Sequence, residues 1–144
     1  MKTRGLFVAG LLTAFLFGAT ASMGQKVPVV MQADLSTNDD PTALRFSKSL
    51  SDDIQLSGKF YYWTAKDSAL PSNGIRILVR SIQIKLEDGS ELGSAIFVEA
   101  DRPSLKEAGY YKVISGHFLM IPKDASVADE TRSFRAEVDR SLEP

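Results

Sequence analysis

Apolar residues recur at helical spacing after a polar, acidic stretch near residue 40. Between Pro41 and Ile54 they step mostly by three or four positions, which places them on one face of a helix. Asp40 suits the N-cap, Pro41 the first helical position, and Gly58 a left-handed C-terminal cap. The pattern therefore predicts a helix from Pro41 to just before Gly58. The residues predicted for its buried face are Ala43, Leu44, Phe46, Leu50 and Ile54.

A second helical pattern lies at the end of the chain. Ser126 is predicted as its N-cap, and Asp129 and Glu130 fall in the first turn, where acidic side chains complement the helix dipole. Arg135 and Asp139, four residues apart, are placed to form an ion pair on the outer side. The predicted apolar face consists of Val127, Thr131, Phe134, Val138 and Leu142.

Alternating apolar and polar residues predict five strands outside the helices. The predicted strands cover about residues 27–31, 59–65, 75–86, 91–100 and 110–122. The alternation changes phase within the third strand, where Ile75, Ile77 and Val79 share one face. The opposite face of the same strand takes Ile82, Ile84 and Leu86. This slip predicts a β-bulge near Arg80 and Ser81.

The order of elements is strand, helix, four strands, helix. A parallel crossover is expected for the first strand–helix–strand unit, and hairpin connections for the later strands. We therefore expect an α+β two-layer sandwich, with a mixed, mostly antiparallel sheet and both helices on one face. If the last four strands run as a meander, the loops Lys66–Asn73 and Asp101–Gly109 lie at the same end of the sheet.

Residues 1–21 have the features of a signal peptide. Lys2 and Arg4 precede an apolar run, and the segment ends in Ala19-Thr20-Ala21, a small-x-small sequence typical of cleavage sites. The apolar run is short for a membrane span, although a retained anchor is the alternative. We expect cleavage after Ala21, which leaves residues 22–144 as a single domain in the periplasm or outside the cell, with no stable membrane span.

Charge and composition exclude several classes of function. The full chain carries 17 basic and 18 acidic residues, and removal of Lys2 and Arg4 lowers the net charge from −1 to −3. No basic cluster suited to nucleic acid is present. The chain contains no cysteine, which excludes disulfides and thiol catalysis.

Candidate chemistry is sparse. His117 is the single histidine, and with no cysteine this excludes the common zinc sites. Ser115 lies two residues before His117 on the last predicted strand, but no nucleophile-elbow sequence accompanies the pair. The glycines of residues 89–95 lack the lysine of a phosphate-binding loop, and residues 36–46 lack the glycine and terminal glutamate of an EF-hand. A pair of carboxylates for glycoside hydrolysis stays an open alternative, because the distance between two carboxylates depends on the fold and not on their spacing in the sequence. We predict no enzyme activity, metal or cofactor.

The segment FSKSLSDDIQLSGKFYYW contains a helix, a Ser-Gly-x-Phe step and a strand. The step is formed by Ser57, Gly58, Lys59 and Phe60. This segment resembles the amino-terminal domain of TolB-type translocation proteins and small exported bacterial proteins of unassigned function. The layout of most of residues 22–144 fits the resemblance, while the residue signature spans about twenty positions and no β-propeller follows. The resemblance implies a non-enzymatic adaptor domain in the cell envelope.

Both faces of the predicted sheet carry large apolar residues, although two helices cover one face only. The uncovered face then forms an apolar surface of the kind that binds proteins. Tyr61, Trp63 and Phe97 are the predicted anchors for a protein partner or a second copy of the chain. One alternative is a small-ligand or glycan-binding domain that uses the two long loops. A second alternative is that strand twist or the amino-terminal segment buries these aromatic residues.

Overall fold

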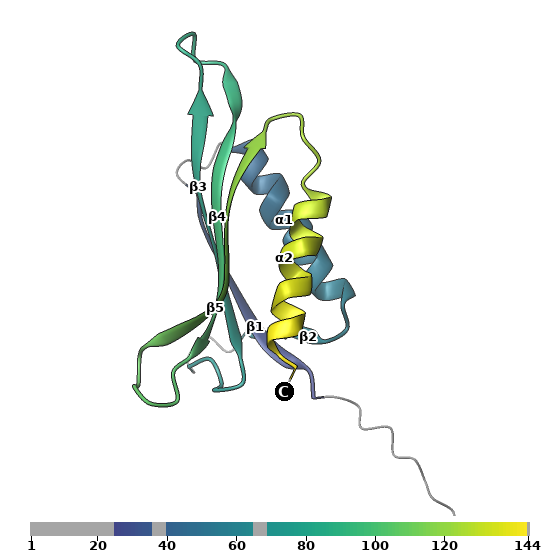
Figure 1. The fold of residues 1–144 in the computed structure, drawn as a ribbon, viewed down its shortest axis with the longest axis vertical. Coiled ribbons are helices and arrows are strands. Elements are labelled where there is room, and N and C mark those ends of the chain that lie inside the picture. Colours follow the sequence, from purple (N-terminus) through teal and green to yellow (C-terminus); the bar gives the residue numbers. More distant parts are fainter. Residues whose placement is uncertain (1–24, 36–39, 65–68, 144) are drawn as a thin grey trace, which may run out of the picture.

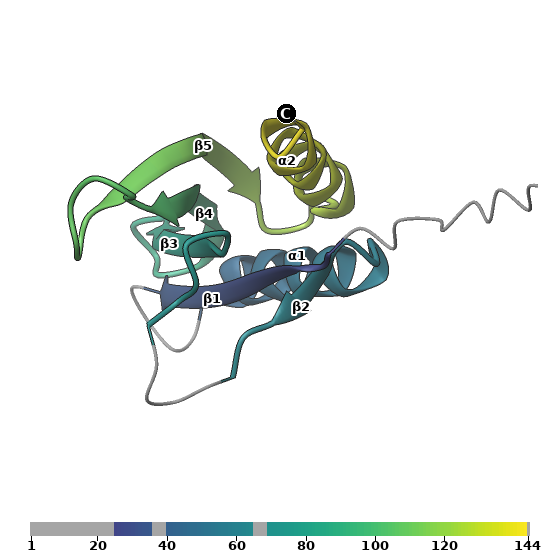
Figure 2. The same cartoon turned by 90° about the horizontal axis from the view of Figure 1, so that it is seen from below.

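Five strands form one mixed sheet, and two helices lie against one of its faces (Figures 1 and 2). The computed structural model describes residues 25–35, 40–64 and 69–143. The predicted signal peptide therefore lies outside the described residues. In chain order the elements are β1 (Val27–Leu35), α1 (Pro41–Leu56), β2 (Phe60–Tyr62), β3 (Ile75–Lys85), β4 (Glu91–Pro103), β5 (Tyr111–Pro122) and α2 (Ala128–Ser141). The predicted α+β class and element order are confirmed.

The strands lie in the order β2-β1-β3-β4-β5. β1 pairs in parallel with both β2 and β3, whereas β3–β4 and β4–β5 are the longer, antiparallel pairings. The predicted meander is wrong at its first step, because β1 separates β2 from β3. The short β2 adds to the outer edge of β1, so the chain must cross β1 before β3 begins. The start of β3 and the β4–β5 loop nevertheless lie at the same end of the sheet, since Arg76 pairs with Asp101.

Helix α1 begins at the residue that the sequence predicts. The buried Asp40 carboxylate accepts a hydrogen bond from the Ala43 backbone N–H at 2.9 Å. It also accepts from the hydroxyls of Ser81 on β3, at 2.9 Å, and Ser94 on β4, at 2.6 Å. Asp40 therefore caps the helix and joins it to two central strands. Gly58 takes the predicted left-handed conformation, with φ 67°.

The core lies between the helices and the sheet. Four of the five residues predicted for the buried face of α1 are buried, but Leu44 is 47% exposed. The buried stripe of α1 continues from Ala43 to Phe46, three residues later. Leu44 follows Ala43 directly and therefore lies outside that stripe. Helix α2 buries Thr131, Phe134 and Val138 as predicted. It begins one residue later than expected, and the Ser126 hydroxyl accepts from the Ala128 N–H at 3.4 Å without occupying the N-cap position.

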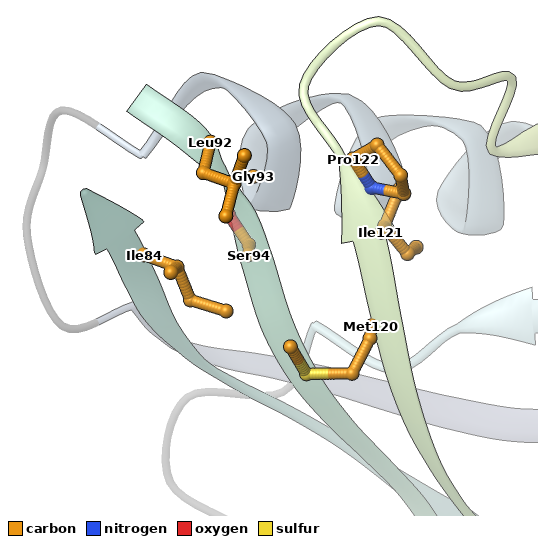
Figure 3. Close-up of a pocket in the computed structure, with 7 residues that line it drawn as sticks. All are labelled: Ile84, Leu92, Gly93, Ser94, Met120, Ile121 and Pro122. Carbon is orange, nitrogen blue, oxygen red and sulfur yellow. The ribbon is translucent and has the colours of Figure 1, made fainter. Parts of the chain in front are cut away.

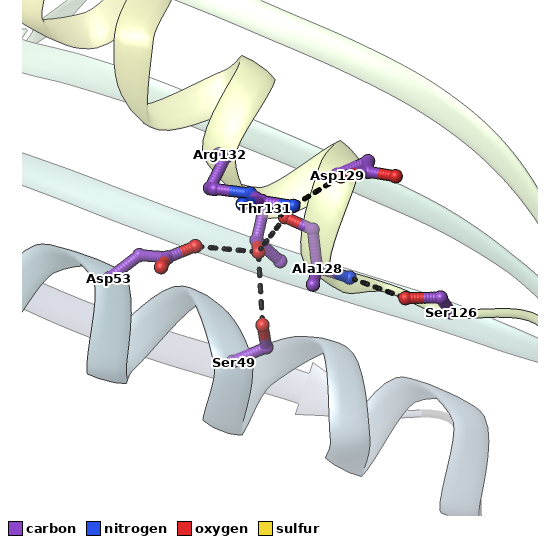
Figure 4. A network of polar contacts seen from close by, with 7 residues as sticks. All are labelled: Ser49, Asp53, Ser126, Ala128, Asp129, Thr131 and Arg132. Atoms are coloured by element: carbon purple, nitrogen blue, oxygen red, sulfur yellow. Dashed lines mark hydrogen bonds and ion pairs between the residues drawn. The ribbon is translucent and has the colours of Figure 1, made fainter.

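Polar side chains join the two helices (Figure 4). The buried Thr131 hydroxyl donates to the Asp53 carboxylate at 2.7 Å and accepts from the Ser49 hydroxyl at 3.0 Å. Arg135 and Asp139 form the predicted ion pair, at 3.5 Å, but not on the outer side, since their side chains are only 29% and 14% exposed. Asp53 lies outside the apolar stripe of α1, and its carboxylate fixes the position of α2 on α1.

The predicted bulge near residues 80 and 81 is absent from β3, whose register with β4 runs without interruption from Arg76 to Ile84. The irregularity lies between Ile84 and Lys85. At residue 81 the helix-covered face meets the polar N-terminus of α1, and a serine that binds Asp40 occupies the position. The apolar residues that follow lie on the opposite, uncovered face. The phase slip therefore marks the point at which the apolar side chains move from the covered to the uncovered face, while the strand itself stays regular.

Candidate interaction surface

Apolar side chains gather on the helix-free face of β3, β4 and β5, in the half nearer the β3–β4 turn. We call this set the distal patch: Ile82, Ile84, Phe97, Phe118 and Met120. Ile82 and Phe118 are each 68% exposed and Met120 is 60% exposed, while Ile84 and Phe97 are half-buried. Phe97 pairs with Phe118 across β4 and β5, so these rings are cross-strand neighbours on one face.

Two hollows lie within this half of the face. One, of about 310 Å³, is lined by Asp34, Arg80, Ser81, Ile82, Ala95, Phe97 and Phe118. The other, of about 250 Å³, is lined by Ile84, Leu92, Gly93, Ser94, Met120, Ile121 and Pro122 (Figure 3). Gly93 lies between Ile84 and Pro122 in the cross-strand row, and its missing side chain leaves the second hollow open. A Cβ at this position would overlap the Ile121 carbonyl oxygen and lie 2.8 Å from the Pro122 Cα.

The opposite half of the same face is closed by a polar cluster. The Arg76 guanidinium donates to both oxygens of Asp101, at 2.6 to 3.3 Å, and lies 3.6 Å from the centre of the Tyr111 ring. The Asp101 side chain is 1% exposed. Its hydrogen bonds raise the pKa of Arg76 above the ordinary value. This cluster joins β3, β4 and β5.

The three predicted anchors lie on the helix-free side but do not form one cluster. Tyr61 is 42% exposed and Trp63 half-buried, with ring centres 6.5 Å apart in an edge-to-face arrangement. Phe97 belongs to the distal patch. From the register along β1 and the strand spacing, Tyr61 and Phe97 lie roughly 25 Å apart. Tyr61 and Trp63 are therefore separate from Phe97.

The sequence prediction did not include Ile82, Phe118 and Met120, the three most exposed members of the distal patch. Their signal was present in the phase slip of β3 and in the apolar residues of both parities on β5. Period-two alternation alone does not identify the covered face. That assignment needs the strand order and the position of the helices.

The possible serine–histidine–carboxylate site is a structural link. His117 Nε2 lies 2.8 Å from a Glu137 carboxylate oxygen, and the Ser115 hydroxyl donates to the same oxygen at 3.0 Å. These two hydrogen bonds lower the pKa of Glu137, the bond from His117 contributing most. The Ser115 proton is directed at the carboxylate, so His117 is not placed to remove it. The three side chains join β5 to α2, and the His117 ring also contacts Phe134 edge to face.

Within the part of the chain that the structure describes, no group of three or more acidic or histidine side chains could hold a metal ion. Neither helix in these same residues is long and apolar enough to cross a membrane.

No protein-family model and no curated protein matches the chain. Two solved structures similar to this chain are PelC dodecamers from Paraburkholderia phytofirmans. One is 13% identical, with a TM-score of 0.45, and the match covers 85% of this chain and 92% of that chain. The other is 15% identical, with a TM-score of 0.42, and covers 83% and 88%. Neither is a TolB domain, and the resemblance to that domain stays a prediction.

Proposed function

We propose that this chain is an exported envelope protein that acts as a non-enzymatic interaction module through the helix-free face of β3, β4 and β5. The exposed apolar distal patch is the observation that carries the proposal. Isolated apolar residues are common on protein surfaces, but a contiguous group is typical of an interaction site. Phe118 and Ile82 are both exposed by two thirds and lie on strands of a rigid sheet. The patch contains Phe97, one of the predicted anchors, and leaves out Tyr61 and Trp63.

The electrostatic setting of the distal patch supports protein binding. Asp34 and Arg80 line the larger hollow, and among the described residues no charged side chain lines the smaller one. An apolar centre with charges at its rim is the usual organisation of a protein–protein interface. Substitution of a central apolar residue should therefore weaken association more than substitution at the rim.

The alternative function, small-ligand or glycan binding, has weaker support. The volumes of the two hollows, about 310 and 250 Å³, are near the lower limit for small-molecule pockets, about 300 Å³. The smaller hollow also offers few polar side chains to orient a sugar.

The proposal is tested by crosslinking in the envelope of the producing cell, followed by purification of a tagged full chain. We expect Ile82→Glu to abolish the crosslink to a protein bound at the distal patch. Leu105→Glu is the matched control, because Leu105 is 85% exposed on the β4–β5 loop at the other end of the sheet. Equal crosslinking by both variants and the unmodified chain would refute the proposal, provided that circular dichroism shows both variants folded. Mass spectrometry of the same material tests export, since a processed chain should begin at Ser22.

A further inference from the structure

Among the described residues, strand β5 forms a long open edge of the sheet, whereas the opposite edge is the three-residue β2. The Lys123 N–H donates to the Leu92 carbonyl at 3.1 Å, and the pairing continues in step from Gly93–Pro122 to Ala100–Ser115. Hydrogen-bonded and non-hydrogen-bonded pairs alternate in an antiparallel ladder. The backbone groups of Gly116, Phe118 and Met120 therefore point away from β4.

The open stretch has defined limits. The pairing with β4 shifts at Ala100 and Asp101, opposite residues 113–115, and Pro122 ends the strand without an N–H group. Natural edge strands are commonly protected by lysine, proline or a bulge. Residues 115–121 contain no acidic residue, lysine, arginine or proline. The bulge and the proline thus leave an unprotected segment whose central residue is Phe118.

We propose that this segment pairs with β5 of a second copy of the chain, antiparallel and about a two-fold axis at Phe118. The inference goes beyond the proposed function, because this contact uses the β5 edge and is separate from a contact made by the distal patch. In this register Phe118 lies opposite Phe118 of the other copy, and Gly116 lies opposite Met120. All three residues have backbone groups that point outward, so each opposing pair can exchange backbone hydrogen bonds.

The side chains of the segment match this register. Met120, which is 60% exposed, would lie over the space left by Gly116, and the two Phe118 rings would meet at the axis. On the helix side of the sheet, His117 of one copy would lie opposite Leu119 of the other, so the two His117 side chains would not face each other. A seven-residue edge and two large side chains bury on the order of 500 Å² per copy, less than the ~800 Å² of a standard interface. A dimer that dissociates on dilution is therefore expected.

The natural absence of cysteine allows a direct test of the register. Opposing residues of a hydrogen-bonded antiparallel pair have Cα atoms about 5.5 Å apart, within the range that a disulfide spans. We expect a mixture of the Gly116→Cys and Met120→Cys full chains to form a covalent dimer on mild oxidation. Each variant alone should form no covalent dimer, because the two sulfurs of a dimer of identical variants would lie roughly 14 Å apart. A Cβ at Gly116 meets no atom closer than 3.9 Å, so this substitution fits the fold.

Analytical ultracentrifugation of the unmodified full chain, Phe118→Lys and Ile82→Lys separates edge pairing from packing of the faces. Phe118 and Ile82 are equally exposed, but only Phe118 lies on the β5 edge. We expect a concentration-dependent dimer for the unmodified chain and Ile82→Lys, and a monomer for Phe118→Lys. A monomeric unmodified chain, or no selective crosslink between the two cysteine variants, would overturn the inference. If a different protein is still crosslinked through Ile82 in the envelope, the proposed function survives that failure.

Discussion

Substitution of Asp40 is predicted to cause a large loss of stability, because its carboxylate joins three elements. It accepts from the Ala43 N–H at the start of α1 and from the hydroxyls of Ser81 on β3 and Ser94 on β4. All three polar side chains are buried. Asp40→Ala removes the acceptor for all three groups.

The expected magnitude follows from these bonds. Loss of an N-cap costs about 1 kcal/mol, and a buried hydroxyl without its acceptor costs about 1–3 kcal/mol. Removal of a buried charge offsets part of this sum. We therefore expect Asp40→Ala to lower the free energy of unfolding by about 3–5 kcal/mol, a large fraction of the 5–15 kcal/mol typical of a domain. Asp40→Asn retains a cap and one acceptor oxygen, and should cost about 1–2 kcal/mol.

The assay is equilibrium urea unfolding, followed by circular dichroism and by the fluorescence of the single tryptophan, Trp63. Equal m-values for the three proteins would show that they unfold to comparable states. A loss below about 1 kcal/mol for Asp40→Ala, or equal losses for Asp40→Ala and Asp40→Asn, would refute the role assigned to the carboxylate. The Ser81→Ala variant then tests the link to β3 by a double-mutant cycle with Asp40→Ala.

Two further predictions concern β4 and α2. Gly93→Ala should destabilise the fold by about 1–3 kcal/mol in urea unfolding, because a Cβ there overlaps the backbone of β5, whereas Gly116→Ala should change stability far less. Hydrogen bonds hold the pKa of Glu137 below its ordinary value of 4.5, so their stabilising contribution is present above that value and is lost as the pH falls through the lower, folded-state pKa. Glu137→Gln should therefore show a shallower loss of unfolding free energy than the unmodified chain as the pH is lowered below about 5, and parallel pH profiles would contradict the link to His117. The effect should be small, since Glu137 is 36% exposed.

The helices were predictable because their signals are local. Asp40, Pro41 and Gly58 mark the ends of α1 through backbone chemistry that acts within a few residues. The periodic burial of Phe46 and Leu50 follows from the same local geometry. These features do not depend on which strand lies beside which.

The strand order was not predictable by the same means. The three-residue β2 pairs with β1, although a hairpin with β3 fits the turn-rich connection equally well. The phase slip of β3 was visible in the sequence, but its cause depends on the contact of Ser81 with Asp40, forty-one residues earlier in the chain. Contacts between residues this far apart in the sequence determine which apolar side chains of the sheet the helices cover. They also determine that Ile82 and Phe118, more than Tyr61 and Trp63, form the exposed surface.

The central claim is that the distal patch is a contact surface in the cell envelope. The most direct measurement places a photoreactive amino acid at residue 82 of the full chain, with residue 105 as the control, and irradiates the producing cells. Both native side chains are exposed, Ile82 by 68% and Leu105 by 85%. We predict a discrete adduct, with a partner or a second copy of the chain, from residue 82 and none from residue 105. The absence of an adduct at residue 82, or equal adducts at both positions, would contradict the claim.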